Sequence, residues 1–120
     1  MCYPVVVATQ QMDEQTYRAQ MDTTLARIEK AFADVDPDLL ECTVAHGAMT
    51  LELSGGARCI LSGQPSVRQL WLAVAAKGVA YHFNWDTEKK AWLDDKTQKI
   101  ELLSYLEKLM AELAKLSIRI

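Results

Sequence analysis

The sequence has few of the residues from which disulfide frameworks, zinc sites and membrane spans are built. Its 120 residues include three cysteines, Cys2, Cys42 and Cys59, and no two of them have the Cys-x-x-Cys spacing. Scattered cysteines in an odd number argue against a disulfide framework or a zinc knuckle, and predict buried or idle thiols in a reducing compartment. The longest apolar runs, such as residues 70–76, are far shorter than the roughly 20 residues that cross a bilayer. The first residues also lack the pattern of a secretory signal.

Motifs of catalysis by protein nucleophiles are missing as well. The sequence contains no Gly-x-Ser-x-Gly, His-Glu-x-x-His, Walker A or glycine-rich phosphate loop. Gly55 and Gly56 stand in a short predicted turn between strands rather than before a helix, so they cannot form a phosphate cradle. These absences argue against hydrolases and transferases that work through a serine or cysteine nucleophile.

Basic residues are absent from one internal window. None occurs between Lys30 and Arg58, although this window holds five acidic residues. Residues 1–52 carry nine acids and three bases, a net charge of −6, whereas residues 53–120 carry seven acids and ten bases, a net charge of +3. A surface of this kind attracts cations or basic partners and repels nucleic acid. The alternative is a solvated acidic loop without a ligand.

The chain is half hydrophobic, which excludes disorder of the whole chain, and its periodicity begins with a helix. Asp13 and Glu14 place negative charge where the positive end of a helix dipole would lie. Apolar residues then recur at helical spacing, at Tyr17, Met21, Leu25, Ile28 and Phe32. The helix should end before Pro37, which disfavours helical geometry at the preceding residue.

From Glu41 the period of the apolar residues changes to two, as in strands. The alternating stretches are residues 49–53, 57–61, 69–75 and 79–85, with a short last strand at 91–93. Turn signals separate them at residues 46–47, 54–56, 62–65 and 76–78. In the strand at 79–85, Val79, Tyr81, Phe83 and Trp85 are expected to point inward.

A second amphipathic helix closes the chain. Thr97 is its predicted N-cap. One face of the helix carries Ile100, Leu103, Leu106, Met110 and Leu113, widened by Leu102, Leu109 and Leu116. Two apolar helix faces require one apolar sheet face, so the predicted class is α+β. The architecture is a two-layer αβ sandwich with both helices on one face of a mostly antiparallel sheet of five to six strands.

The opposite sheet face should meet water and still carries a large aromatic residue. If Leu70 and Leu72 point to the helices, Trp71 points to solvent. Gln69 shares its face, His82 lies on the adjoining strand, and Arg68 precedes both. Aromatic, arginine and amide side chains together are typical of interface hot spots. The alternatives are that a neighbour or a register shift covers Trp71, and that His82 is an ordinary exposed histidine.

Carboxylates without histidine or cysteine bind hard cations such as Fe²⁺, Fe³⁺, Ca²⁺, Mg²⁺ or Mn²⁺. Such binding is weak and exchangeable, which suits a carrier or a sensor better than a fixed catalytic metal.

Several segments of the sequence resemble the frataxin family, and bacterial frataxins most. They are residues 47–53 with Gly56, Gln64-Pro65, residues 68–73, Tyr81-His82-Phe83 and Trp92-Leu93-Asp94-Asp95. The resemblance covers residues 12–116 as a single frataxin-like domain. Residues 1–11 form a leader of unknown role, and residues 117–120 form a tail.

The resemblance implies a protein that binds iron weakly through an acidic ridge, with other divalent cations as alternatives. The family's ridge positions fall on Asp22, Glu29, Asp34, Asp36, Asp38 and Glu41. It also implies partners, namely the cysteine desulfurase and the scaffold protein that build iron–sulfur clusters. The docking residues would be Arg68, Gln69, Trp71 and His82.

The function expected on these grounds is delivery or sensing of iron and modulation of the cysteine desulfurase. Two alternatives remain open: a ferroxidase or iron-storage protein, and a regulatory interaction module that works without metal. The chain is expected to be a monomer, with iron-dependent oligomers as an alternative, and to bind neither nucleic acid nor membrane. A bacterial protein of this kind would be cytoplasmic, and a eukaryotic one would lie in the mitochondrial matrix.

Overall fold

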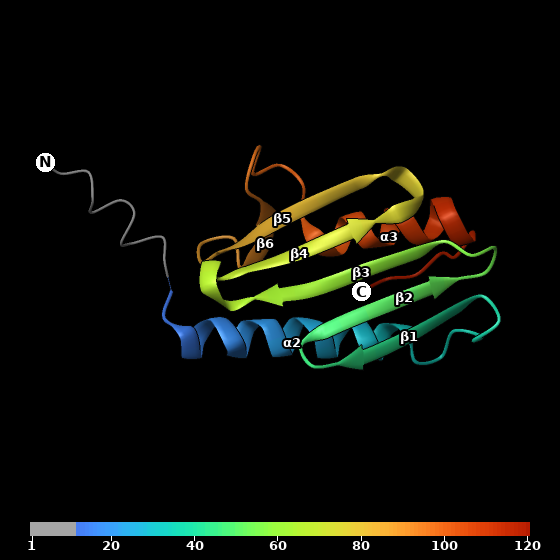
Figure 1. Ribbon diagram of the computed structural model, residues 1–120, viewed down its shortest axis with the longest axis horizontal. Helices are drawn as coiled ribbons and strands as arrows, with labels where there is room; N and C mark the ends of the chain where they lie inside the picture. Colours follow the sequence, from blue (N-terminus) through green and yellow to red (C-terminus); the bar gives the residue numbers. More distant parts are fainter. Residues whose placement is uncertain (1–11) are drawn as a thin grey trace, which may run out of the picture.

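The computed structural model describes residues 12–120, so the predicted leader lies outside the described residues. Along the chain, one helix precedes and another follows a series of six strands and two short 3-10 turns (Figure 1). The elements are α2 (Glu14–Phe32), β1 (Leu40–Ala45), β2 (Ala48–Leu53), β3 (Arg58–Gln64), η1 (Pro65–Val67), β4 (Gln69–Val74), η2 (Ala75–Lys77), β5 (Val79–Asp86), β6 (Ala91–Asp94) and α3 (Leu102–Ala114).

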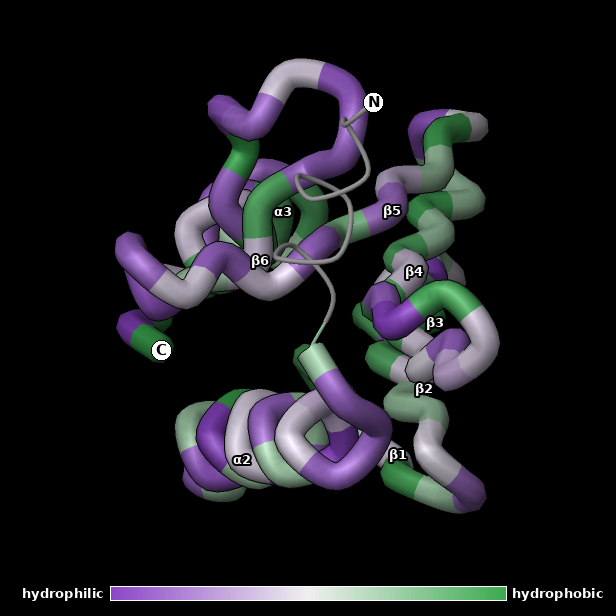
Figure 2. Tube along the Cα trace, turned by 90° about the vertical axis from the view of Figure 1, so that its left-hand side faces the viewer, coloured by the Kyte–Doolittle hydropathy of each residue, from purple (hydrophilic) through white to green (hydrophobic). Residues whose placement is uncertain are grey.

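The strands form one antiparallel sheet in which each strand pairs with the next along the chain, from β1 to β6. Both helices lie on the same side of this sheet, and the sheet bends so that β6 lies near α3 (Figure 2). This arrangement confirms the predicted two-layer α+β sandwich. Within residues 12–120, neither helix combines the length and the apolar character needed to cross a bilayer.

Helix α2 forms as its sequence predicts. The Asp13 carboxylate caps it by accepting a 2.7 Å hydrogen bond from the Thr16 N–H. All five residues of the predicted apolar stripe are buried, from Tyr17 to Phe32. On the same face, the Thr24 hydroxyl accepts a 2.8 Å hydrogen bond from the indole N–H of Trp92. This bond ties the middle of α2 to β6.

Strand β3 ends three residues later than the predicted strand, because Ser62, Gly63 and Gln64 continue it instead of forming a turn. The physical reason is the close approach of α2. A side-chain carbon at Gly63 would lie 2.2 Å from the Met21 sulfur and 3.1 Å from the Tyr17 hydroxyl. The glycine therefore marks the place where the helix packs on the sheet.

The start of α3 corrects the sequence prediction. Glu101, not Thr97, is the N-cap: its carboxylate accepts hydrogen bonds from the N–H groups of Leu103 (2.8 Å) and Ser104 (3.0 Å). The predicted cap residue instead bonds to Asp94 in the loop before the helix.

The packed face of α3 is also rotated from the predicted one. Leu103 and Leu113 are half-buried, and Ile100 lies before the helix. The fully packed residues are Leu102, Leu106, Leu109, Met110 and Ala114. Val79, which was expected to point into the core, is 36% exposed because it begins β5 at the open end of the sheet.

Candidate functional site

The sheet face turned away from the helices is free of charge at its centre. Residues in register on neighbouring antiparallel strands share a face, so the pairing defines two adjacent rows across the sheet. One row is Thr43, Thr50, Ile60, Ala73 and Ala80, and the other is Ala45, Ala48, Ser62, Trp71 and His82. We call these ten residues the outer face. Apart from His82 they have no ionisable side chain, and most are small, so this surface is largely uncharged.

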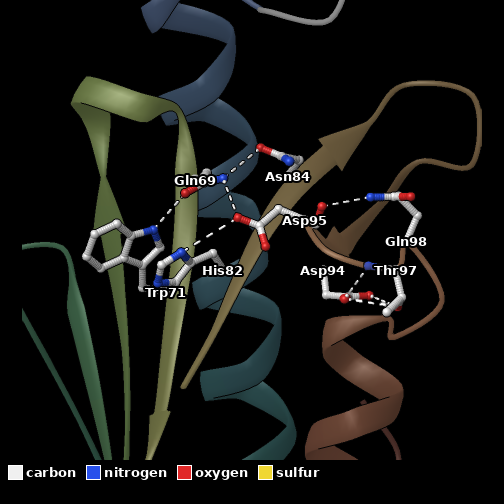
Figure 3. Close-up of polar contacts among 8 residues, drawn as sticks. All are labelled: Gln69, Trp71, His82, Asn84, Asp94, Asp95, Thr97 and Gln98. Atoms are coloured by element: carbon white, nitrogen blue, oxygen red, sulfur yellow. Dashed lines mark hydrogen bonds and ion pairs between the residues drawn. The ribbon is translucent and has the colours of Figure 1, made fainter. Parts of the chain in front are cut away.

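Trp71 lies on this face, as its strand pattern predicts. Leu70 and Leu72 on either side of it are fully buried against the helices. Trp71 itself is half-buried because the His82 ring stacks on it, with ring centroids 4.2 Å apart and planes 13° from parallel. Its indole N–H donates a 2.8 Å hydrogen bond to the side-chain oxygen of Gln69 (Figure 3). The stack and this bond hold the ring in one orientation.

The polar contacts continue from Gln69 to two residues that sequence reasoning missed. The Gln69 amino group donates to Asn84 Oδ1 at 3.2 Å and to Asp95 Oδ2 at 3.4 Å. The same Asp95 oxygen lies 3.6 Å from His82 Nδ1. Gln69, Trp71, His82, Asn84 and Asp95 thus form one connected group, which we call the aromatic platform (Figure 3). Asn84 alternates with His82 along the same strand, a signal that could have indicated it.

Asp95 comes from a loop that is folded around the preceding residue. The Asp94 side chain is only 4% exposed, and it accepts hydrogen bonds from the N–H groups of Thr97, Lys99 and Ile100 and from the Thr97 hydroxyl. Burial raises the pKa of Asp94, but these hydrogen bonds to the ionised carboxylate outweigh it and leave the pKa below its usual range. A single carboxylate therefore organises the loop that carries Asp95.

Arg68, expected on the docking patch, is held at the turn before β4. Its backbone is left-handed, with φ 54°, and its guanidinium donates to the backbone carbonyls of Met12 and Pro65. Nearby, the Tyr17 hydroxyl donates a 2.7 Å hydrogen bond to the Gln69 carbonyl. The Arg68–Met12 and Tyr17–Gln69 bonds tie the start of α2 to the start of β4. Within residues 12–120, two of the five donors of Arg68 are therefore used in hydrogen bonds to backbone carbonyls.

The predicted acidic ridge lies around the edge strand β1, whereas the aromatic platform lies on β4, β5 and the loop after β6. We call Asp22, Glu29, Asp34, Asp36, Asp38 and Glu41 the acidic flank. All six are exposed. The first two lie on α2, the next three in the loop after it, and the last on β1.

The acidic flank wraps around the edge of the sheet rather than lying in one plane. Glu41 is in register with Glu52 and belongs to the side facing away from the helices, since Leu40 beside it is buried. Glu29 lies on the helix side, where burial together with its negative charge raises the pKa of the Cys42 thiol to about 11. Helix and strand place these carboxylates on opposite sides of β1.

The carboxylates of the flank do not converge on one point. Over residues 12–120, no three histidine, cysteine, aspartate or glutamate side chains are grouped so that they could hold a metal ion together. Asp36 is committed to its own loop, because its Oδ1 accepts a 2.9 Å hydrogen bond from the Asp38 N–H. The donor set fits a hard cation bound by one or two carboxylates with water as the remaining ligands.

Comparisons of the sequence and of the fold with known proteins point to the same family. A family model described as a frataxin-like domain matches residues 10–116. The chain belongs to the frataxin family. Two bacterial relatives bear the name iron-sulfur cluster assembly protein CyaY. The protein from Pseudomonas fluorescens strain Pf0-1 is 31% identical over 103 residues, which are 86% of this chain and 90% of that protein. The protein from Pseudomonas aeruginosa is 36% identical over 88 residues, 73% and 79% of the two chains.

Two solved structures share the frataxin fold with this chain. Frataxin from Psychromonas ingrahamii superimposes with a TM-score of 0.79 at 19% identity, covering 90% of this chain and 97% of that one. Trimeric frataxin from Saccharomyces cerevisiae, in complex with ferrous iron, superimposes with a TM-score of 0.58 at 22% identity, covering 88% and 89%. The family's fold, predicted from the sequence motifs, is confirmed.

Proposed function

We propose that this frataxin-family chain is an accessory protein of iron–sulfur cluster assembly. It carries or senses iron on the acidic flank, and docks through the aromatic platform and the outer face onto a cysteine desulfurase and its scaffold protein. The names of its bacterial relatives support the process. The observation that carries the docking role is the Trp71–His82 stack, held in one orientation on an uncharged sheet face.

The chemistry of the outer face favours docking of a protein. Burying charged side chains in an interface is costly, whereas an uncharged face with an aromatic anchor loses little on desolvation. The indole N–H of Trp71 already has a hydrogen-bond acceptor within the protein, so covering the ring leaves no unsatisfied donor. Ile60, in the neighbouring row, is 38% exposed and adds apolar area next to the anchor.

The acidic flank supports the iron-carrying role. Carboxylate oxygens are ligands of hard cations, and an open, water-filled coordination shell allows rapid exchange, as a carrier requires. The same negative charge attracts a basic partner surface and speeds its association. Iron is cargo in this proposal, and it is held loosely enough to be passed on.

The test compares two variants in calorimetric titrations with a purified bacterial cysteine desulfurase. Trp71→Ala removes the anchor and should weaken desulfurase binding about 30-fold or more, as expected for a hot spot worth roughly 2 kcal/mol. Its affinity for Fe²⁺ should be unchanged. Leu39→Ala, which truncates another exposed apolar residue away from the platform, is the matched control.

The second variant combines Asp34→Asn, Asp36→Asn and Asp38→Asn, which keeps the shape of the loop and removes three charges. It should weaken Fe²⁺ binding and slow association with the desulfurase, while the Trp71 anchor still binds. Wild-type desulfurase affinity of Trp71→Ala would refute the docking role. A triple variant that regulates the desulfurase as the wild type does would instead establish a metal-independent interaction module.

A further inference from the structure

We propose that Asp95 is the positioning residue of the aromatic platform: its carboxylate fixes the Gln69 amide and the His82 ring, and through them the plane of Trp71. This inference rests on the proposed docking role of Trp71. It adds a residue outside the sheet, on the loop between β6 and α3, as a determinant of how the docking surface is presented.

The hydrogen-bond donors and acceptors around the Gln69 amide match in one orientation of that amide. An indole N–H can only donate, so Gln69 must turn its oxygen toward Trp71. The Gln69 amino group is then directed the other way, where Asp95 and Asn84 offer oxygens at 3.4 and 3.2 Å. An ionised carboxylate can only accept, so Asp95 permits this amide orientation and opposes the flipped one.

The same carboxylate oxygen also restrains the His82 ring, the other member of the stack. Asp95 Oδ2 lies 3.6 Å from Nδ1 of His82, whose ring lies flat against Trp71. One oxygen thus contacts both side chains that touch the indole, Gln69 at its N–H and His82 at its face. Loss of this oxygen would remove one contact from each neighbour at once.

Asp95 is itself held in place by hydrogen bonds before any partner binds. Its N–H donates a 2.8 Å hydrogen bond to the His82 carbonyl, and its own carbonyl accepts one of 2.8 Å from the Gln98 side chain. Gln98 adopts a left-handed backbone, with φ 58°, and its N–H bonds to the Asp94 carbonyl at 3.0 Å. Asp95 is therefore preorganised, which reduces the entropy lost when a partner binds.

The network also indicates what a partner must present. Because the Trp71 N–H is used internally, the indole offers only its apolar plane. Asn84 is exposed and uses its oxygen toward Gln69, while its amino group makes no hydrogen bond within residues 12–120. The partner surface that fits places an apolar or planar side chain on Trp71 and a carbonyl or carboxylate oxygen next to Asn84.

The test follows the indole N–H signals in ¹H–¹⁵N spectra. Trp71→Phe assigns the Trp71 signal, and Trp92, bonded to Thr24, serves as an internal reference. Asp95→Ala should move the Trp71 signal toward the position of a water-exposed indole and leave Trp92 unchanged. Asp95→Asn retains an acceptor oxygen for Gln69 and should restore most of the shift. Glu88→Ala, the same loss of charge in the exposed β5–β6 turn, should leave both signals in place.

The same variants are titrated with a purified bacterial cysteine desulfurase. Asp95→Ala should weaken binding about five- to tenfold, which corresponds to the loss of roughly one hydrogen bond's worth of preorganisation. An unchanged Trp71 signal in Asp95→Ala would overturn the inference. Movement of the Trp92 signal together with that of Trp71, without rescue by Asp95→Asn, would overturn it too by showing a general structural role.

The two proposals fail separately. If Trp71→Ala binds the desulfurase like the wild type, the docking role is lost, while the spectra still show whether Asp95 sets the indole. If Trp71→Ala weakens binding and Asp95→Ala does not, the docking role stands and the positioning role is refuted.

Discussion

The acidic flank and the aromatic platform are built on opposite principles. The six carboxylates of the flank are all exposed, and within residues 12–120 Asp36 is the one whose side chain accepts a hydrogen bond. In the platform, each of the five side chains contacts at least one other. The flank supplies charge that acts over about a Debye length without fixed geometry, whereas the platform supplies geometry with little net charge.

This difference predicts how each region responds to change. Side chains that act through a shared field contribute separately, and salt screens them. Side chains in one hydrogen-bonded group depend on one another, and salt affects them little. Substitutions and salt should therefore act differently on the acidic flank and on the aromatic platform.

The largest effect is expected at Asp94, which holds the loop beneath the platform. Asp94→Ala leaves three backbone N–H groups without their acceptor and should lower the free energy of unfolding by about 2–4 kcal/mol. Urea unfolding followed by circular dichroism measures this. The Trp71 indole signal should move as well, because the loop carries Asp95.

The effect of Asp94 should also depend on pH with a defined sign. Its pKa is lowered on folding from the ordinary 3.8, so the ionised carboxylate stabilises the protein above that value. This stability is lost as the pH falls below 3.8 and through the lower pKa of the folded state. The difference between wild type and Asp94→Ala should therefore be full at pH 7 and shrink below pH 4. A difference of constant size down to pH 2 would contradict the assignment.

The next largest expected effect, about 1 kcal/mol, is the coupling energy between two residues of the aromatic platform. Gln69→Ala and Asp95→Ala remove the two ends of one hydrogen bond, so a double-mutant cycle of unfolding free energies should show a coupling of about 0.5–1.5 kcal/mol. In the flank, Asp34→Asn and Glu41→Gln should instead weaken Fe²⁺ binding independently, with losses that add within about 0.5 kcal/mol. Strong coupling within the flank would reveal a convergent metal site.

Salt should affect the two regions differently. Neutralising Asp34, Asp36 and Asp38 with asparagine relieves repulsion and should raise the free energy of unfolding by less than about 1 kcal/mol at low ionic strength. In 1 M NaCl this gain should disappear, and melting curves at the two salt concentrations measure it. Destabilisation by Asp94→Ala should persist in both. A salt-independent gain in the flank variant would mean that something other than repulsion is relieved.

The smallest effect concerns the Cys42 thiol, which reports where Glu29 lies. Burial and then the Glu29 charge raise its pKa to about 11, so alkylation by iodoacetamide should be slow at pH 8 and speed up toward pH 11. Glu29→Gln should lower this pKa by a fraction of a unit and leave it above the ordinary 9.0, since burial remains. The measurement uses a Cys2→Ser background. Asp22→Asn, a charge change two turns earlier on α2, should have no effect.

Sequence reasoning placed the buried residues of α2 and β4 correctly, was partly wrong about the packed face of α3, and failed where burial imposes no period. The stripe from Tyr17 to Phe32 and the alternation around Trp71 are correct because each element has one packed face. Strand β1 was not delimited, since it lies at the edge and four of its six residues are exposed. The end of β3 was mistaken for a turn because Gly63 also serves close packing.

The candidate site divides in the same way. The acidic window after Lys30 and the outward direction of Trp71 follow from composition and from strand alternation, which are local properties, whereas Asp22 and Glu29 were expected from the family resemblance. The link between Asp95 and Gln69, and the use of Arg68 at carbonyls of Met12 and Pro65, join segments far apart in the chain. No periodicity encodes such contacts.

Residue patterns along the chain suffice to show that two amphipathic helices cover one face of a strand meander, and that negative charge gathers in the first half of the chain. Within residues 12–120, the packing of the layers places these charges around an edge strand without bringing them together, and brings a loop carboxylate next to the two side chains that contact the half-buried indole. The reason is physical. Hydrophobic burial is a periodic, nearly local requirement of each element. Hydrogen bonds between side chains instead require donor–acceptor distances that are correct to within a few tenths of an ångström, and these distances are set only after the layers have packed.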